Sequence, residues 1–107
     1  MANTITAEEL KRRIESGEKL ALYDLRRQAD FEADSELLPG AVRMDPAKVG
    51  EWAANLPKDG SAVIYCARGG SISKSTQEDL AGRGMDIPYL EGGHAAWKNL
   101  DKKFSKE

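Results

Sequence analysis

The residue with the clearest chemical potential in this sequence is Cys66, the only cysteine of the chain. It follows a short apolar run, Ala62–Tyr65, which predicts a strand buried on both faces. A glycine pair, Gly69 and Gly70, comes soon afterwards and favours a tight turn whose backbone is bare of side chains. A thiol placed here would face backbone N–H groups and the beginning of the next helix. Both stabilise negative charge, so the pattern predicts a nucleophilic thiolate.

The loop that follows Cys66 supplies the residues that would contact a substrate. Arg68 is the nearest cation, and together with the loop amides it would favour the thiolate and hold an anionic sulfur compound. We predict that the substrate-binding residues are consecutive in the chain: Ala67, Arg68, Gly69, Gly70, Ser71 and Ile72. Two simpler interpretations stay open. Arg68 is equally well explained as a solvated loop charge, and the hydroxyls of Ser71 and Ser73 as caps of the next helix.

A second polar cluster follows the strand predicted at residues 20–23. Asp24 and Arg26 would lie beyond the carboxyl end of that strand, where ligands bind in open parallel sheets. Paired polar residues at a strand end more commonly hold loops through hydrogen bonds. We therefore predict that Asp24 and Arg26 support the loops around Cys66 rather than touch the substrate.

Composition limits the classes of function. The 107 residues carry a net charge of -2, with a pI near 5.5, which argues against nucleic acid or an anionic membrane as a partner. One cysteine and one histidine provide no set of zinc ligands, so we expect no metal and no other cofactor. A single cysteine also excludes an internal disulfide, and the sequence shows neither an apolar segment of ~20 residues nor a signal-peptide core. We therefore expect a cytoplasmic protein.

The elements that must position these residues alternate in type along the chain. Residues 6–9, Thr-Ala-Glu-Glu, match a capping box, and Asp45 before Pro46 predicts a second helix start. We expect strands near residues 20–23, 41–44, 62–65 and 87–90, and helices near residues 7–16, 28–33, 47–55, 71–82 and 94–102. Trp52 and Trp97 have the spacing of core anchors. This alternation predicts a single α/β domain, residues 1–107, with a mainly parallel sheet.

Three motifs in this order resemble the rhodanese family of single-domain sulfurtransferases. They are Asp24-Leu25-Arg26, the loop at residues 66–73, and Glu91-Gly92-Gly93-His94-Ala95-Ala96-Trp97. Pro39-Gly40-Ala41 is similar to a turn of that family, and the resemblance extends over residues 5–100. It implies a rhodanese-like fold, in which a five-stranded, mainly parallel sheet is flanked by helices on both faces.

The resemblance also implies an activity. Cys66 would attack the outer sulfur of a donor such as thiosulfate, release sulfite, and carry the sulfur as a persulfide to a thiol or to cyanide. The implied partners are a small anionic sulfur donor and a thiol, cyanide or protein acceptor. Two positions depart from the pattern of many active members. Leu37 stands in place of a histidine and Ser71 in place of an arginine, which leaves Arg68 as the nearest loop arginine.

Other functions compete with sulfur transfer as an interpretation of the sequence. Phosphatases and arsenate reductases of the same fold require an arginine at the position that Ile72 occupies, which argues against phosphoryl transfer. A non-enzymatic module that carries a persulfide, senses or binds a protein is the main alternative. Without the loop and the resemblance, Cys66 would be interpreted as an inert buried thiol. His94 begins the last predicted helix, where it would lie near the pocket rim or have a structural role.

Overall fold

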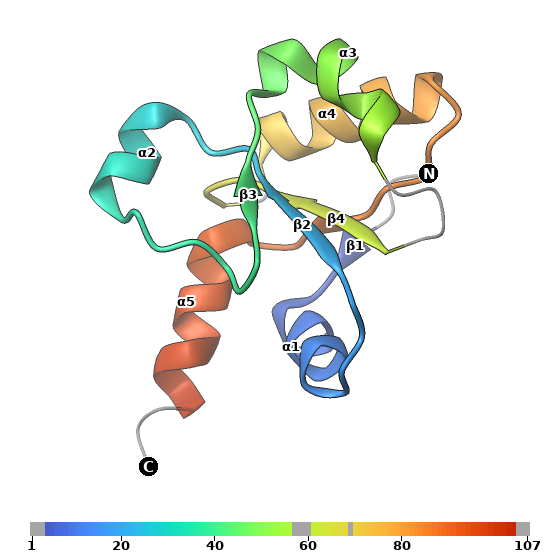
Figure 1. Ribbon diagram of the computed structural model, residues 1–107. Coiled ribbons are helices and arrows are strands. Elements are labelled where there is room, and N and C mark those ends of the chain that lie inside the picture. The colour runs from blue at the N-terminus through green and yellow to red at the C-terminus, as the bar shows by residue number, and fades with distance from the viewer. Residues whose placement is uncertain (1–3, 57–60, 69, 105–107) are drawn as a thin grey trace.

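The computed structural model describes residues 4–56, 61–68 and 70–104, with side chains as far as residue 100 (Figure 1). Within these residues, five strands form one sheet in the order β1-β5-β4-β2-β3, and every neighbouring pair is parallel. The strands are β1 (Thr4–Ile5), β2 (Ala21–Asp24), β3 (Val42–Arg43), β4 (Ala62–Tyr65) and β5 (Tyr89–Leu90). The expected five-stranded parallel sheet is therefore confirmed, and the strand before Cys66 lies at its centre.

Helices cover both faces of this sheet, as expected for the α/β class (Figure 1). α1 (Ala7–Glu15) and α5 (Gly93–Phe104) lie together on one face, whereas α3 (Val49–Trp52) and α4 (Ser71–Gly82) lie together on the other. α2 (Gln28–Ala33) belongs to the connection between β2 and β3. Among the described helices, none has the length and apolar character needed to cross a membrane.

The central strand β4 separates two apolar cores. All of its residues have 0 % exposed surface, because the strand is paired on both edges and covered on both faces. Ala62 and Ile64 belong to the core under α3 and α4, whereas Val63 and Tyr65 belong to the core under α1 and α5. The same alternation places Cys66 with the first of these cores.

Side-chain caps form at two of the predicted helix starts. Thr6 Oγ1 accepts a hydrogen bond from the N–H of Glu9 at 3.1 Å, at the beginning of α1. Asp45 Oδ1 accepts one from the N–H of Ala47 at 2.9 Å, with Pro46 in the first position. These bonds satisfy N–H groups that a helix start otherwise leaves without a partner.

The helix predicted at residues 47–55 is broken into a 3-10 turn, η1 (Pro46–Lys48), the short α3, and a second 3-10 turn, η2 (Ala53–Asn55). The carbonyl of Asp45 explains the first break. It accepts the N–H of Lys48 at 2.9 Å and the indole N–H of Trp52 at 2.8 Å, instead of continuing an α-helical ladder. The prediction of one continuous helix is therefore wrong, although Trp52 is buried as expected.

Two predicted strands are shorter than expected. The segments at residues 41–44 and 87–90 form strands of two residues each. Pro88 has no N–H to donate, although its carbonyl accepts the N–H of Ile64 at 3.1 Å. Only the residues after this proline are therefore assigned to β5.

Candidate functional site

Cys66 lies at the carboxyl end of β4. It is a free thiol with 4 % of its surface exposed, and it belongs to the apolar cluster under α3 and α4. Leu25 and Ile64 are members of that cluster, and Ile72 packs against it. Among the described residues, no group of three His, Cys, Asp or Glu side chains could hold a metal ion. The thiol is largely covered, so a reagent must reach it past neighbouring side chains.

The backbone after Cys66 is held by the beginning of α5. The N–H of His94 donates to the carbonyl of Cys66 at 2.8 Å, and the N–H of Ala95 donates to the carbonyl of Ala67 at 2.9 Å. A planar trans peptide points its C=O and its N–H in opposite directions. The amides of Ala67 and Arg68 therefore point away from α5, and neither donates a hydrogen bond to a described residue. Two N–H groups next to the cysteine thus have no acceptor among the described residues.

The other predicted substrate-binding residues lie in different surroundings. Arg68 and Gly70 are exposed, and Arg68 forms no ion pair with any residue that the structure describes. Ser71 and Ile72 begin α4 and line a groove with a volume of about 360 Å³. Gly69 lies outside the described residues. The structure therefore brings two of the predicted residues to one cavity and leaves Arg68 at the surface.

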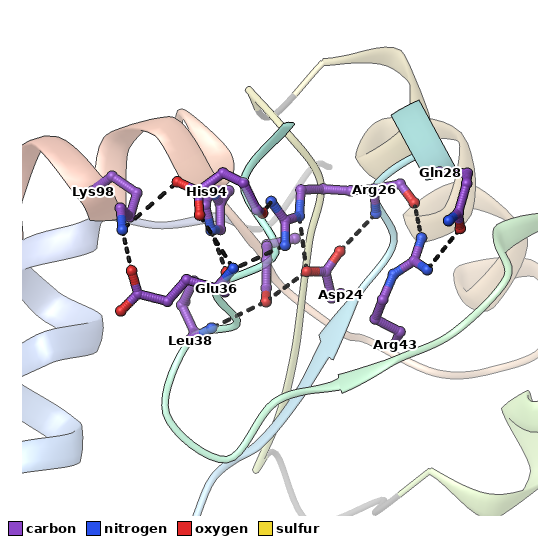
Figure 2. A network of polar contacts seen from close by, with 10 residues as sticks. Asp24, Arg26, Gln28, Glu36, Leu38, Arg43, His94 and Lys98 are labelled. Carbon is purple, nitrogen blue, oxygen red and sulfur yellow. Dashed lines mark hydrogen bonds and ion pairs between the residues drawn. The ribbon is translucent and has the colours of Figure 1, made fainter. Parts of the chain in front are cut away.

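Asp24 and Arg26 form a buried ion pair near the end of β2 (Figure 2). Their side chains are 0 % and 1 % exposed. Arg26 donates to Asp24 from its backbone N–H at 2.8 Å and from Nε at 2.9 Å, and the Tyr65 hydroxyl donates to Asp24 Oδ2 at 2.9 Å. Burial raises the pKa of Tyr65 well above its ordinary value, so this hydroxyl stays protonated and keeps donating. Asp24 thereby connects the end of β2 to the residue that precedes Cys66.

The segment between α2 and β3 is tied to both β2 and α5 (Figure 2). The Arg26 guanidinium donates to the carbonyl of Asp34 at 2.6 Å and to that of Glu36 at 3.3 Å. His94 Nε2 lies 2.6 Å from the same Glu36 carbonyl, and because a carbonyl only accepts, Nε2 carries the proton. Lys98, one turn further along α5, pairs with the carboxylates of Glu36 and Asp34. This polar network joins three parts of the chain next to the cysteine loop.

Arg43, at the end of β3, extends the polar network on its other side (Figure 2). Its guanidinium donates to the carbonyl of Arg26 at 2.9 Å and to Gln28 Oε1 at 3.1 Å. It also lies over the ring of Phe31, 4.2 Å from the ring centroid. Arg26 and Arg43 therefore both donate to protein groups, although Arg43 Nε is buried without a hydrogen-bond partner among the described residues.

Sequence reasoning left the role of His94 open and did not identify Tyr65, Glu36 or Lys98. Glu36 and His94 are 58 residues apart in the chain, so no local spacing could pair them. The only local signal was the spacing of His94 and Lys98, since residues four apart share one face of a helix.

The chain matches known proteins in sequence. A family model described as the rhodanese-like domain matches residues 6–100. A tRNA 2-selenouridine synthase from Shewanella frigidimarina is 37% identical over 74 residues, which are 69% of this chain and 20% of that protein. A probable adenylyltransferase/sulfurtransferase from Mycobacterium tuberculosis is 32% identical over 99 residues, which cover 89% of this chain and 24% of that protein. The chain therefore spans a quarter or less of the length of these relatives.

The fold also matches solved structures. A rhodanese-like domain protein from Staphylococcus aureus has a TM-score of 0.75 and 27% sequence identity, with 89% of this chain and 90% of that one covered. The family model reaches from the N-cap of α1 almost to the end of the described part of α5. The chain belongs to the rhodanese-like domain family.

Proposed function

We propose that this protein is a sulfurtransferase that moves a sulfane sulfur through a persulfide on Cys66. The Cys66 thiolate attacks the outer sulfur of a donor such as thiosulfate, the S–S bond of the donor breaks, and sulfite leaves with the bonding electron pair. Cyanide or a thiolate then attacks the terminal sulfur of the persulfide, the new S–S bond breaks, and the Cys66 thiolate returns. Cys66 is therefore both nucleophile and carrier.

The orientation of the backbone after Cys66 carries this proposal. The amides of Ala67 and Arg68 point away from α5 and have no hydrogen-bond acceptor among the described residues. The thiolate and the persulfide are both anions, and N–H donors stabilise an anion more than the neutral form. Exposed Arg68 would add positive charge at the entrance for an anionic donor.

The names of the relatives support sulfur or selenium transfer as the general chemistry. One is named for selenouridine synthesis in tRNA and the other for sulfur transfer. This chain covers only 20% and 24% of those proteins, so their substrates are not carried over with the family. For this chain we propose a small anionic sulfur donor, a thiol, cyanide or protein acceptor, and a cytoplasmic location.

A non-enzymatic persulfide carrier for a partner protein is the second candidate. The 4 % exposure of Cys66 favours it, because such a thiol is hard to reach for reagents in free solution. A carrier would be loaded once and keep its sulfur until the partner arrives. An enzyme would instead pass sulfur to small acceptors over many turnovers.

Intact-mass measurement after incubation with thiosulfate tests the proposal. We expect the wild-type protein to gain one sulfur atom and Cys66→Ser to gain none, with a known rhodanese loaded in parallel as the control. Cyanide should then release thiocyanate repeatedly from an enzyme, whereas a carrier would keep its sulfur when cyanide is added. An unmodified wild-type mass, under conditions that load the control, would contradict the proposal.

A further inference from the structure

The strand β1 leaves one edge of the sheet without a partner among the described residues. It pairs with β5 alone, and the carbonyl of Ile5 accepts the N–H of Glu91 at 2.9 Å. A planar trans peptide directs its C=O and its N–H in opposite directions, so the N–H of Thr6 points away from β5. The carbonyl of Thr4 faces the same outer side, because successive residues of a paired strand face opposite edges. Neither group bonds to a described residue, so this edge offers one backbone donor and one acceptor.

Two grooves adjoin this edge, and Thr6 lines both of them. The first has a volume of about 340 Å³, lies between the beginning of α1 and α5, and is lined in part by Glu8 and Glu91. The second has a volume of about 480 Å³ and is lined by both residues of β1 together with Glu9 and Asp86. The open strand edge is therefore accompanied by space in which the side chains of a bound segment could lie.

The charges around these grooves are mainly negative. Four exposed carboxylates line them, from Glu8, Glu9, Asp86 and Glu91. The one cation among the described lining residues, Arg13, already contacts the carboxylate of Glu18 at 2.7 Å. Thr4 Oγ1 donates to Glu91 Oε2 at 2.6 Å, which holds this carboxylate beside the strand. A ligand of this edge must therefore bring positive charge.

This charge selects among the macromolecules that could pair with β1. A second copy of the chain, joined edge to edge about a two-fold axis, would bring the same four carboxylates together, and like charges repel. Nucleic acid and anionic membranes would be repelled in the same way. An extended peptide segment with lysine or arginine side chains would instead pair with the backbone and neutralise the carboxylates.

We propose that the β1 edge and its two grooves bind an extended, basic segment of a partner protein, which adds to the sheet as a further strand. The segment donates a backbone hydrogen bond to the carbonyl of Thr4 and accepts one from the N–H of Thr6. Its basic side chains lie in the grooves against the carboxylates. Only β5 separates β1 from β4, so the segment would lie two strands from the one that leads to Cys66. This binding does not depend on the persulfide chemistry proposed for Cys66.

A titration followed by amide NMR tests the inference on the 107-residue protein. The probe is the peptide acetyl-Lys-Val-Lys-Val-Lys-amide at low ionic strength, and acetyl-Glu-Val-Glu-Val-Glu-amide is its acidic counterpart. We expect the basic peptide to shift the amides of Ile5, Thr6 and Glu91, with the N–H of Thr6 moving downfield, and the acidic peptide to shift none of them. Carboxylates that only keep the edge from pairing with other chains would give no shifts with either peptide, and this result would overturn the inference.

Glu8→Gln combined with Glu91→Gln tests the charges. We expect this double variant to raise the Kd of the basic peptide about two- to thirtyfold, the effect of losing two exposed ion pairs. Glu51→Gln combined with Glu78→Gln is the matched control, because both residues are exposed, neither lines these grooves, and the change of charge is the same. An equal rise in Kd in the two double variants, or no rise in the first, would overturn the inference.

The backbone contribution is tested with the same basic peptide N-methylated at every residue, which keeps the charge but cannot donate to the carbonyl of Thr4. We expect it to bind about two- to tenfold more weakly, the effect of losing one hydrogen bond. Equal affinity of the two basic peptides would show attraction by charge alone and would overturn the addition of a strand.

Discussion

Towards α5, the cysteine loop adjoins the polar network around Asp24, Arg26 and His94, whose hydrogen bonds end on other protein groups (Figure 2). Towards α4 it adjoins a groove lined by the exposed hydroxyls of Ser71 and Ser75. On the first side, Asp24 and Arg26 are almost completely buried and paired with each other. On the second side, Ser71 and Ser75 are exposed and line an open cavity. The loop therefore lies between a side where Asp24 and Arg26 are already bonded to protein groups and a side where the hydroxyls of Ser71 and Ser75 are exposed.

The difference between the two sides distinguishes residues that hold the backbone around the cysteine loop from residues that could contact a substrate. A ligand that displaced Arg26 from Asp24 would leave a buried charge without a partner, at a cost of several kcal/mol. Among the described residues, the amides of Ala67 and Arg68 have no acceptor, and the hydroxyls of Ser71 and Ser75 are exposed in the groove. Substitutions in the polar network should therefore act mainly on stability, and substitutions in the loop and groove mainly on substrate use.

Asp24→Ala should have the largest effect on stability. It leaves the guanidinium of Arg26 buried with no carboxylate, so we expect the free energy of unfolding to fall by about 3–5 kcal/mol. Asp79→Ala is the matched control, because it removes the carboxylate of an exposed ion pair with Arg83 and should cost less than about 1 kcal/mol. Urea denaturation of both variants measures the difference. Equal losses would show that the buried pair has no special role.

Tyr65→Phe should have the next largest effect. It removes the donor to Asp24 Oδ2 and the acceptor of the N–H of Leu38, so we expect a loss of about 1–3 kcal/mol in the free energy of unfolding. Tyr23→Phe is the control, since Tyr23 lies in the same sheet and its hydroxyl bonds to no described residue. If Tyr65→Phe lowered the free energy of unfolding no more than Tyr23→Phe does, the Tyr65 hydroxyl would not stabilise the polar network.

Arg68→Ala should change donor use and leave stability unchanged. Arg68 is exposed and has no ion-pair partner among the described residues. We expect kcat/KM for thiosulfate to fall by up to about fivefold, since the contact of an exposed cation is worth at most about 1 kcal/mol. Arg12→Ala, at an exposed position of α1, serves as the control for a general loss of positive charge. Equal kinetics for the two variants would remove Arg68 from the site.

Lys98→Met should have the smallest effect, visible in the titration of Asp34. The hydrogen bond from the N–H of Glu36 is the largest cause that lowers the pKa of Asp34 below 3.8, and Lys98 lowers that pKa less. Because the pKa of Asp34 is lower in the folded state, the ionised carboxylate stabilises the folded protein above pH 3.8. This contribution to the free energy of unfolding is lost as the pH falls through the pKa that Asp34 has in the folded state. NMR titration of Lys98→Met should show a pKa that rises but stays below 3.8. If the pKa of Asp34 returned completely to 3.8 in this variant, Lys98 and not the N–H of Glu36 would be the main cause of the lowered pKa.

Local patterns predicted the centre of the molecule. An apolar run, a glycine pair and a polar helix start are features of consecutive residues, so β4, the position of Cys66 and α4 could be predicted from them. The same reasoning failed over residues 47–55. The indole of Trp52 takes a hydrogen bond to the carbonyl of Asp45, and no residue pattern indicates such a side-chain contact to the backbone.

The two sides of the loop could not be predicted for the same physical reason. The polar network depends on backbone carbonyls, such as that of Glu36, which Arg26 and His94 both contact. The type of a residue does not reveal in which direction its backbone carbonyl points. The groove combines Pro46 and Ala47 with Ser75 and Thr76, which the fold brings together from two distant segments. Sequence reasoning could therefore name the cysteine that we propose as the sulfur carrier, but not the polar network and the groove on either side of its loop.

An amide NMR spectrum of the protein before and after loading with sulfur tests most directly whether Ala67 and Arg68 hold an anionic sulfur on Cys66. We predict that the amide protons of both residues move downfield on loading, because they then donate to the persulfide, and that Cys66→Ser shows no such change. A wild-type protein that gains one sulfur atom while both resonances stay in place would contradict the account.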